Sequence, residues 1–96
     1  MEFEWDEAKR QSNIEKHGID FAEAVAIFDN YVSMYQDTRA DYGEARYVSI
    51  GLLQGVEIAV IHTFRGGKNR IISARRARVK ERRMYYEERQ RNEDGL

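Results

Sequence analysis

The chain has 96 residues, which is the length of a single domain, here expected to cover residues 1–96. It contains two histidines and no cysteine, so disulfides, thiolate metal sites and cysteine nucleophiles are excluded, and we expect no metal or other cofactor. No apolar run approaches the ~20 residues that cross a membrane, and the acidic N-terminus lacks an apolar signal core. We therefore expect a cytoplasmic protein with no membrane partner.

The net charge of −1 conceals two halves of opposite sign. Residues 1–64 hold five Lys and Arg against twelve Asp and Glu, a net charge of −7, whereas residues 65–96 hold eleven basic and five acidic residues, a net charge of +6. Two interpretations of this asymmetry stay open. Either a basic face attracts a polyanion, or the two halves neutralise each other in the folded chain.

The N-terminal third predicts one short strand and two helices. Residues 2–5 form the strand, and Asp6 is a good N-cap for a helix that runs to about His17. Asp20 is predicted to cap a second helix over residues 21–28. The apolar residues of this second helix recur at i, i+3, i+4 and i+7 and predict a core-facing stripe: Phe21, Ala24, Val25 and Phe28.

Four strands and a helix follow. The strands are predicted over residues 31–36, 46–53, 56–64 and 70–74, and the last three are joined by short turns that contain glycine. Both faces of 56–64 are partly apolar, which predicts a central strand that is covered on both sides. Residues 76–91 are rich in helix formers and contain no breaker, so they predict a C-terminal helix.

The resulting order, β-α-α-β-β-β-β-α, predicts an α+β domain. In this architecture two N-terminal helices cover one face of a small antiparallel sheet. The apolar residues of the C-terminal helix do not form one clear stripe, and its surface is mostly Arg and Glu. A helix this polar either faces solvent or serves as a partner surface.

The first helix carries a line of polar side chains. Asp6, Lys9, Asn13 and Lys16 recur at i, i+3, i+7 and i+10, so they share one face, and His17 lies beside them at the helix end. One interpretation is a solvated face with a weak exposed ion pair. The other is a cationic stripe beside a groove that binds phosphate.

Residues 62–78 hold the second group of candidate side chains. His62 is in register with apolar neighbours, so it is either a buried, hydrogen-bonded core residue or a group that transfers protons near neutral pH. If the flanking strands form a hairpin, His62, Ser73 and Arg75 fall in one neighbourhood, to within one or two residues of register. The same hairpin brings Arg65 near Arg70.

These residue types suit cleavage of RNA without a metal ion. A base removes the proton of the 2′-hydroxyl, cations stabilise the charge on the phosphoryl oxygens, and an acid protonates the leaving oxygen. We expect His62 to act as acid or base and Arg65, Arg75 and Arg76 to hold the phosphate bidentately. The expected RNA-binding residues are Lys9, Lys16, His17, Lys68, Arg70, Ser73 and Tyr85. Tyr47, Tyr85 and Tyr86 could stack on bases.

Two segments of the chain resemble the signature of the BrnT toxin family. The first consists of Phe3-Glu4-Trp5-Asp6, Lys9, Asn13, Lys16-His17-Gly18 and Phe21. The second consists of His62-Thr63, Arg65-Gly66 and Arg70-Ile71-Ile72-Ser73-Ala74-Arg75-Arg76-Ala77, and Glu81, Arg82 and Tyr85-Tyr86 fit the final segment. The resemblance covers nearly the whole chain in the same order.

The resemblance implies the toxin of a type II toxin-antitoxin system, with a fold similar to RelE-type ribonuclease toxins. Such a protein cleaves RNA and halts translation. It is neutralised by a BrnA-like antitoxin whose ribbon-helix-helix domain binds the operator, so that the toxin reaches DNA only through its partner. Two alternatives stay open: a non-catalytic partner and corepressor of a DNA-binding antitoxin, and a domain that binds DNA directly through its Arg-rich C-terminal helix.

Overall fold

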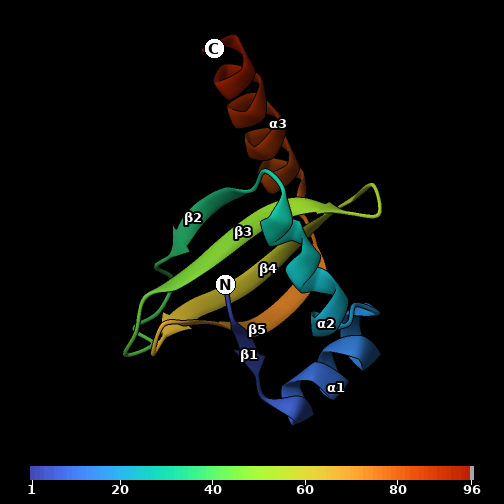
Figure 1. The fold of residues 1–96 in the computed structure, drawn as a ribbon, viewed down its shortest axis with the longest axis vertical. Coiled ribbons are helices and arrows are strands. Elements are labelled where there is room, and N and C mark those ends of the chain that lie inside the picture. The colour runs from blue at the N-terminus through green and yellow to red at the C-terminus, as the bar shows by residue number, and fades with distance from the viewer. Residues whose placement is uncertain (96) are drawn as a thin grey trace.

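The computed structural model describes residues 1–95 and has the predicted α+β architecture and element order (Figure 1). Three helices, one 3₁₀ helix and a five-stranded sheet make up the fold. Their bounds, in chain order, are β1 (Phe3–Trp5), α1 (Glu7–His17), α2 (Phe21–Ala24), η1 (Val25–Asp29), β2 (Ser33–Asp37), β3 (Arg46–Leu53), β4 (Val56–Arg65), β5 (Lys68–Arg76) and α3 (Val79–Asp94). No helix in residues 1–95 combines the length and apolar character needed to cross a membrane.

The sheet has the strand order β1-β5-β4-β3-β2. Strands β2 to β5 pair antiparallel, as expected, but β1 pairs parallel to β5, with Phe3 opposite Asn69 and Trp5 opposite Ile71. The sheet is therefore mixed rather than wholly antiparallel. Strand β4 is the middle strand, and residues 58–63 of β4 are all buried, which confirms the prediction of a central strand.

Two tight turns set the register of the three central strands. Gln54 and Gly55 join β3 to β4 with φ angles of 51° and 78°, and Gly66 and Gly67 join β4 to β5 with φ angles of 59° and 79°. Two consecutive residues with positive φ are characteristic of the type I′ turn, whose twist matches that of the strands it connects. Glycine adopts this backbone without steric cost, so the sequence favours these hairpins.

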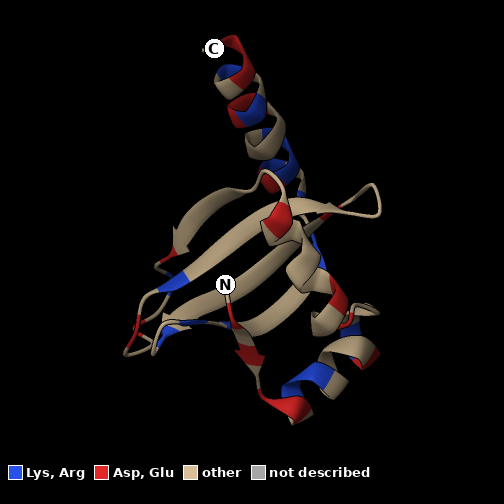
Figure 2. Cartoon of the chain, in the orientation of Figure 1, with Lys and Arg blue, Asp and Glu red and all other residues tan. Residues whose placement is uncertain are grey.

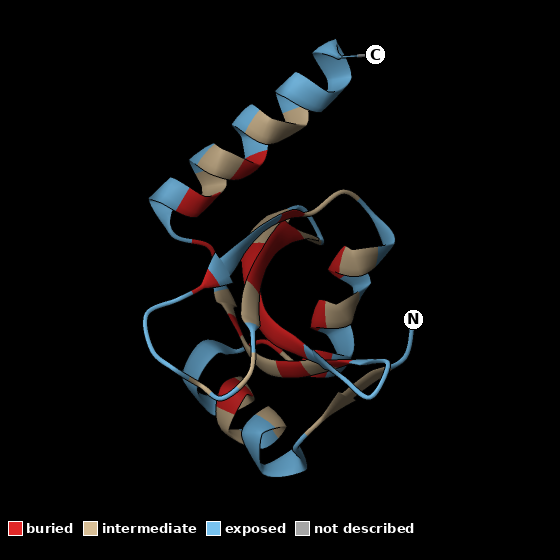
Figure 3. Cartoon of the chain, turned by 90° about the vertical axis from the view of Figure 1, so that its left-hand side faces the viewer, coloured by how far each residue is buried: buried red, intermediate tan, exposed pale blue. Residues whose placement is uncertain are grey.

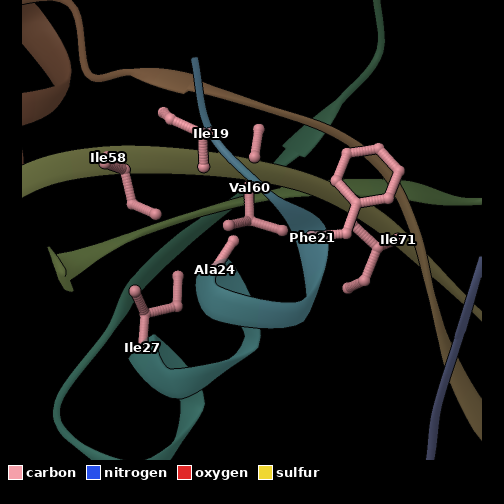
Figure 4. Packing of buried hydrophobic residues seen from close by; sticks show 8 residues of the cluster. Ile19, Phe21, Ala24, Ile27, Ile58, Val60 and Ile71 are labelled. Carbon is pink, nitrogen blue, oxygen red and sulfur yellow. The ribbon is translucent and has the colours of Figure 1, made fainter. Parts of the chain in front are cut away.

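One face of the sheet is covered by α2 and η1. The predicted stripe residues Phe21 and Ala24 are fully buried and pack against β4 and β5, and so does Ile27, which lies outside the predicted stripe (Figure 4). The other two predicted stripe residues, Val25 and Phe28, are only partly buried against this cluster. The predicted second helix is thus present, but it changes to a 3₁₀ helix at Val25. The sheet residues of this cluster are Ile58, Val60, Ile71 and Ala74, and Ile19 completes it.

The opposite face is covered by the first half of α3. Tyr85 packs in a second cluster with Val48, Ile50, Ala59 and Ile61 of the sheet. The second half of the helix projects away from the sheet and is mostly exposed (Figures 1 and 3). The predicted C-terminal helix is therefore present, and the absence of one long apolar stripe is explained because only its first turns are docked.

Helix α1 does not share the face that α2 and η1 cover. It packs against β5 (Figure 1), beyond the short stretch where β1 pairs. Asn13 makes the connection: its Nδ2 donates to the Ala74 carbonyl at 2.9 Å, and its Oδ1 accepts from the Ala74 N–H at 3.1 Å. An amide side chain thus replaces a neighbouring strand at this position. The expectation that both N-terminal helices cover one face is wrong for α1.

Candidate functional site

A pocket of about 270 Å³ lies between α1 and β5. We call it the α1–β5 groove. It unites the two groups of polar residues that the sequence placed far apart, because one wall comes from α1 and the other from β5. The lining residues are Lys9, Ser12, Asn13, Lys16, His17, Ile72 and Ser73.

Helix α1 is fixed at both ends, which positions its polar face. Asp6 caps the first turn by accepting from the Lys9 N–H at 3.1 Å. Gly18 ends the helix in the left-handed conformation, with φ of 69°, and its N–H donates to the Ile14 carbonyl at 2.8 Å. Such caps satisfy backbone groups that have no partner inside the helix. The predicted helix bounds are confirmed, and the expected polar face is the one that lines the groove.

A bulge in β5 shapes the other wall. Ser73 is paired with Ile61, but the next pair is His62 with Ile71, so Ile72 has no partner on β4. Consecutive residues of a regular strand point to opposite faces, and a bulge changes this alternation. As a result Ile72 and Ser73 both line the groove. The Ser73 hydroxyl also donates to Asn13 Oδ1 at 3.3 Å.

The groove carries positive charge that the chain itself does not neutralise. Lys9, Lys16 and His17 are exposed, and within residues 1–95 none of them forms an ion pair. The described lining residues include no Asp or Glu. Two ammonium groups, an imidazole and two hydroxyls around one hollow are suited to hold a phosphate.

The basic residues of the β4–β5 hairpin have a different environment. Each is paired with a carboxylate of the acidic half: Arg65 with Glu44 at 2.6 Å, Arg70 with Glu4 at 3.3 Å, and Lys68 with Glu2 at 3.9 Å. Figure 2 shows acidic and basic segments together at this end of the sheet. The two oppositely charged halves therefore neutralise each other around the hairpin but not in the α1–β5 groove.

Arg75 belongs to a third, separate cluster beneath the start of α3. Its guanidinium binds both carboxylate oxygens of Glu81, at 2.7 and 3.0 Å, and the Tyr35 hydroxyl donates to the same carboxylate at 2.5 Å. Burial opposes ionisation of Glu81, but the Arg75 guanidinium, the Arg78 backbone N–H and the Tyr35 hydroxyl outweigh it and hold its pKa at about 2. Glu81 is thus a fixed anion. Glu81 was not among the predicted site residues; the pattern that could have indicated it is a Glu at the third position of a helix, which is typical of a capping box.

His62 lies in the interior of the protein. Its side chain is 0% exposed, and its ring nitrogens contact the Ser49 hydroxyl at 2.7 Å and Asn69 Oδ1 at 2.8 Å. Burial lowers the pKa of the imidazole, although the Asn69 hydrogen bond opposes this shift. Of the two interpretations made from the sequence, the buried and hydrogen-bonded core residue is the one observed.

The four residues expected to be catalytic do not form one cluster. His62 faces Phe28 on the side of the sheet that η1 covers, so the expected neighbourhood of His62, Ser73 and Arg75 is not formed. Arg65 is paired with Lys68 at the hairpin tip. Lys68 precedes Arg75 by seven residues along β5, which corresponds to about 23 Å at ~3.3 Å per residue. The fourth residue, Arg76, is exposed.

Of the seven expected RNA-binding residues, the groove brings four together: Lys9, Lys16, His17 and Ser73. Lys68 and Arg70 lie at the hairpin with their carboxylate partners. Tyr85 is 2% exposed and packs on Tyr31 with 5.5 Å between ring centroids, so it is not available for stacking on a base while α3 is docked. Sequence reasoning missed Ser12 and Ile72 of the groove.

Within residues 1–95 no three His, Cys, Asp or Glu side chains gather as metal ligands. No curated protein sequence matches the chain. A family match is found: residues 5–81 match the family described as "Ribonuclease toxin, BrnT, of type II toxin-antitoxin system". The match spans both walls of the α1–β5 groove and extends to Glu81. The chain therefore belongs to the BrnT family of ribonuclease toxins, which act in type II toxin-antitoxin systems with an antitoxin as partner.

Proposed function

We propose that this toxin is a metal-independent endoribonuclease that binds an RNA phosphate in the α1–β5 groove. The observation that carries the proposal is the meeting of Lys9, Lys16 and His17 with Ser73 in one pocket that has no carboxylate in its described lining. Cations without ion-pair partners attract a polyanion strongly, because binding costs no existing salt bridge. The hairpin arginines, by contrast, would first have to exchange their carboxylates for phosphate.

The reaction proposed is attack by the 2′-hydroxyl of the RNA on its own phosphorus. A bond forms between the 2′-oxygen and phosphorus, and the bond from phosphorus to the 5′-oxygen breaks, which leaves a 2′,3′-cyclic phosphate and a 5′-hydroxyl. The lysine ammonium groups stabilise the additional negative charge on the phosphoryl oxygens. His17 is assigned the transfer of the proton from the 2′-hydroxyl to the leaving 5′-oxygen, because this histidine is exposed at the groove whereas His62 is buried.

The other basic residues predicted from the sequence lie outside the α1–β5 groove. Arg76, which is exposed, is available to contact a phosphate of the flanking nucleotides, whereas Lys68 and Arg70 contact phosphate only if Glu2 and Glu4 release them. Arg65 and Arg75 bind phosphate only if Glu44 and Glu81 release them. His62 has a structural role in this proposal: its ring bonds Ser49 of β3 and Asn69 of β5 and so stabilises the strands next to the groove.

The test uses the purified chain, a labelled RNA and excess EDTA. We expect cleavage that leaves cyclic phosphate ends, a loss of 10²- to 10⁴-fold in rate for His17→Ala, and weaker RNA binding with a shallower salt dependence for Lys9→Ala combined with Lys16→Ala. Lys80→Ala removes an exposed lysine outside the groove and serves as the matched control. Cleavage that requires a divalent ion, or undiminished cleavage by the groove variants, would contradict the proposal.

We further propose that the cleavage halts translation and that a BrnA-like ribbon-helix-helix antitoxin neutralises the toxin and carries it to operator DNA. Expression of the wild-type chain in a bacterial host should stop incorporation of labelled amino acids, and co-expression of the antitoxin should restore it. If wild-type protein cleaves no RNA and leaves translation intact but is required for operator binding, the alternative of a non-catalytic corepressor holds instead.

A further inference from the structure

A further pocket lies on elements other than those that form the α1–β5 groove. It has a volume of about 490 Å³ and lies between β2 and the first turns of α3. A second hollow of about 290 Å³ shares Tyr35 and Arg78 with it and is also lined by residues 36–39, at and just beyond the end of β2. Together we call them the β2–α3 groove, and its other lining residues include Val79, Lys80, Glu81 and Met84.

The β2–α3 groove contains exposed apolar side chains and lies beside an open sheet edge. Val79, which lines the groove, is 58% exposed at the start of α3, and Met84 lines the groove as well. Strand β2 is the last strand of the sheet and is paired with β3 only. One side of β2 therefore offers backbone N–H and C=O groups to an additional strand, the arrangement by which an extended peptide adds to a sheet.

The charges of the β2–α3 groove favour an acidic occupant. The buried carboxylate of Asp37 is held by the Arg39 guanidinium at 2.9 Å, and the carboxylate of Glu81 is held by Arg75. These acidic groups are thus already neutralised. Arg78 and Lys80 form no ion pair within residues 1–95, so they are the charges that a partner would meet.

We propose that the β2–α3 groove is the docking surface for an extended segment of the antitoxin that carries both apolar and acidic side chains. In an added strand, alternate side chains point the same way, so the side chains that face the groove would include apolar ones against Val79 and Met84 and acidic ones against Arg78 and Lys80. An RNA occupant is less favoured because the described lining holds a single aromatic residue for stacking on bases, Tyr35, whose hydroxyl is already bonded to Glu81. The proposal rests on the antitoxin partner of the family and not on the RNA chemistry.

The test uses the full-length chain and the antitoxin that restores growth to cells expressing it. We expect Val79→Asp and Lys80→Glu each to weaken antitoxin binding at least tenfold in a titration, while cleavage of RNA without antitoxin stays unchanged. Lys80→Glu places a carboxylate in the first turn of α3, where the helix dipole favours it, so loss of binding would not reflect loss of the helix. Arg83→Glu is the matched control because Arg83 is also exposed on α3 but does not line the groove.

A second measurement locates the contact. Hydrogen exchange of the amides in residues 33–37 should slow when the antitoxin is bound and stay fast with Val79→Asp at the same antitoxin concentration. Unchanged antitoxin binding by both variants would overturn the proposal. Variants that lose RNA cleavage but still bind the antitoxin would also overturn it, because the groove would then be an RNA-binding surface. Variants that only abolish a dimer of the chain would overturn it too, because the groove would then be a self-association surface. Failure of His17→Ala to affect cleavage would contradict only the proposed RNA chemistry.

Discussion

Replacing Asn13 by alanine should destabilise the protein far more than the loss of a few side-chain atoms suggests. The Asn13 side chain is 5% exposed and takes part in four hydrogen bonds. Its Nδ2 donates to the carbonyls of Ile19 and Ala74, and its Oδ1 accepts from the Ala74 N–H and the Ser73 hydroxyl. One amide therefore holds α1, the following loop and β5 together.

The expected loss follows from the groups left without partners. Each hydrogen bond contributes about 0.5–1.5 kcal/mol, and a buried backbone group left unpaired costs about 1–3 kcal/mol. Water entering at the groove would recover part of this, so we expect Asn13→Ala to lower the free energy of unfolding by about 2–4 kcal/mol. Because alanine is the better helix former by about 0.5 kcal/mol, the measured loss slightly understates the contribution of the hydrogen bonds.

Urea unfolding followed by circular dichroism measures this difference directly. In a domain of this size, about 1 kcal/mol corresponds to about 4–8 °C in Tm, so a thermal scan should show a decrease of more than about 8 °C. Gln11→Ala is the control, since Gln11 lies on the same helix but is exposed and bonds only Glu7. A loss of less than about 1 kcal/mol for Asn13→Ala would refute the view that this amide replaces a strand at the edge of β5.

Three other predictions concern the core and the buried ionisable groups. Gly51→Ala should destabilise the protein by about 1–3 kcal/mol in urea unfolding, because the added Cβ would lie 2.8 Å from Ile27 Cβ. The pKa of His62, measured by NMR, should lie below the ordinary value of 6.5 because the side chain is buried. Folding favours the neutral imidazole, so the free energy of unfolding should fall as pH drops below 6.5. An ordinary titration midpoint would contradict the burial of His62. Glu81 has a pKa of about 2, against 4.5 for an ordinary glutamate, so it should contribute stability above pH 4.5 that is lost as pH falls toward 2. Glu81→Gln cannot pair with Arg75 as an anion and should remove this part of the acid dependence of unfolding.

The elements of the fold could be predicted because local signals agree with the final structure. Asp6 and Asp20 cap helices as expected, and the glycine turns place β3, β4 and β5 in one meander. The parallel pairing of β1 could not be predicted, since it depends on a contact between residues 3–5 and 69–71 for which the sequence carries no local pattern. The position of α1 was missed for the same reason, because it depends on Asn13 reaching Ala74.

The candidate site was predicted in part. The spacing of Lys9 and Lys16 identified the polar face of α1, and the motif around Ser73 identified the opposite wall, but only the fold could bring them together. The role expected for His62 depended on which side of β4 it faces and on what covers it there. The bulge at Ile72, which aligns His62 with Ile71, and the packing of Phe28 on the imidazole are tertiary effects.

The contact between α1 and β5 also determines when the α1–β5 groove forms during synthesis. Its walls are formed by α1 and by residues 72–73, so His17 and Ile72, 55 positions apart in the sequence, must both be present. Closing a loop of this length costs entropy that only the completed contacts offset. A nascent chain that ends before β5 has no such groove, and any ribonuclease activity located there begins only when the ribosome has made most of the toxin.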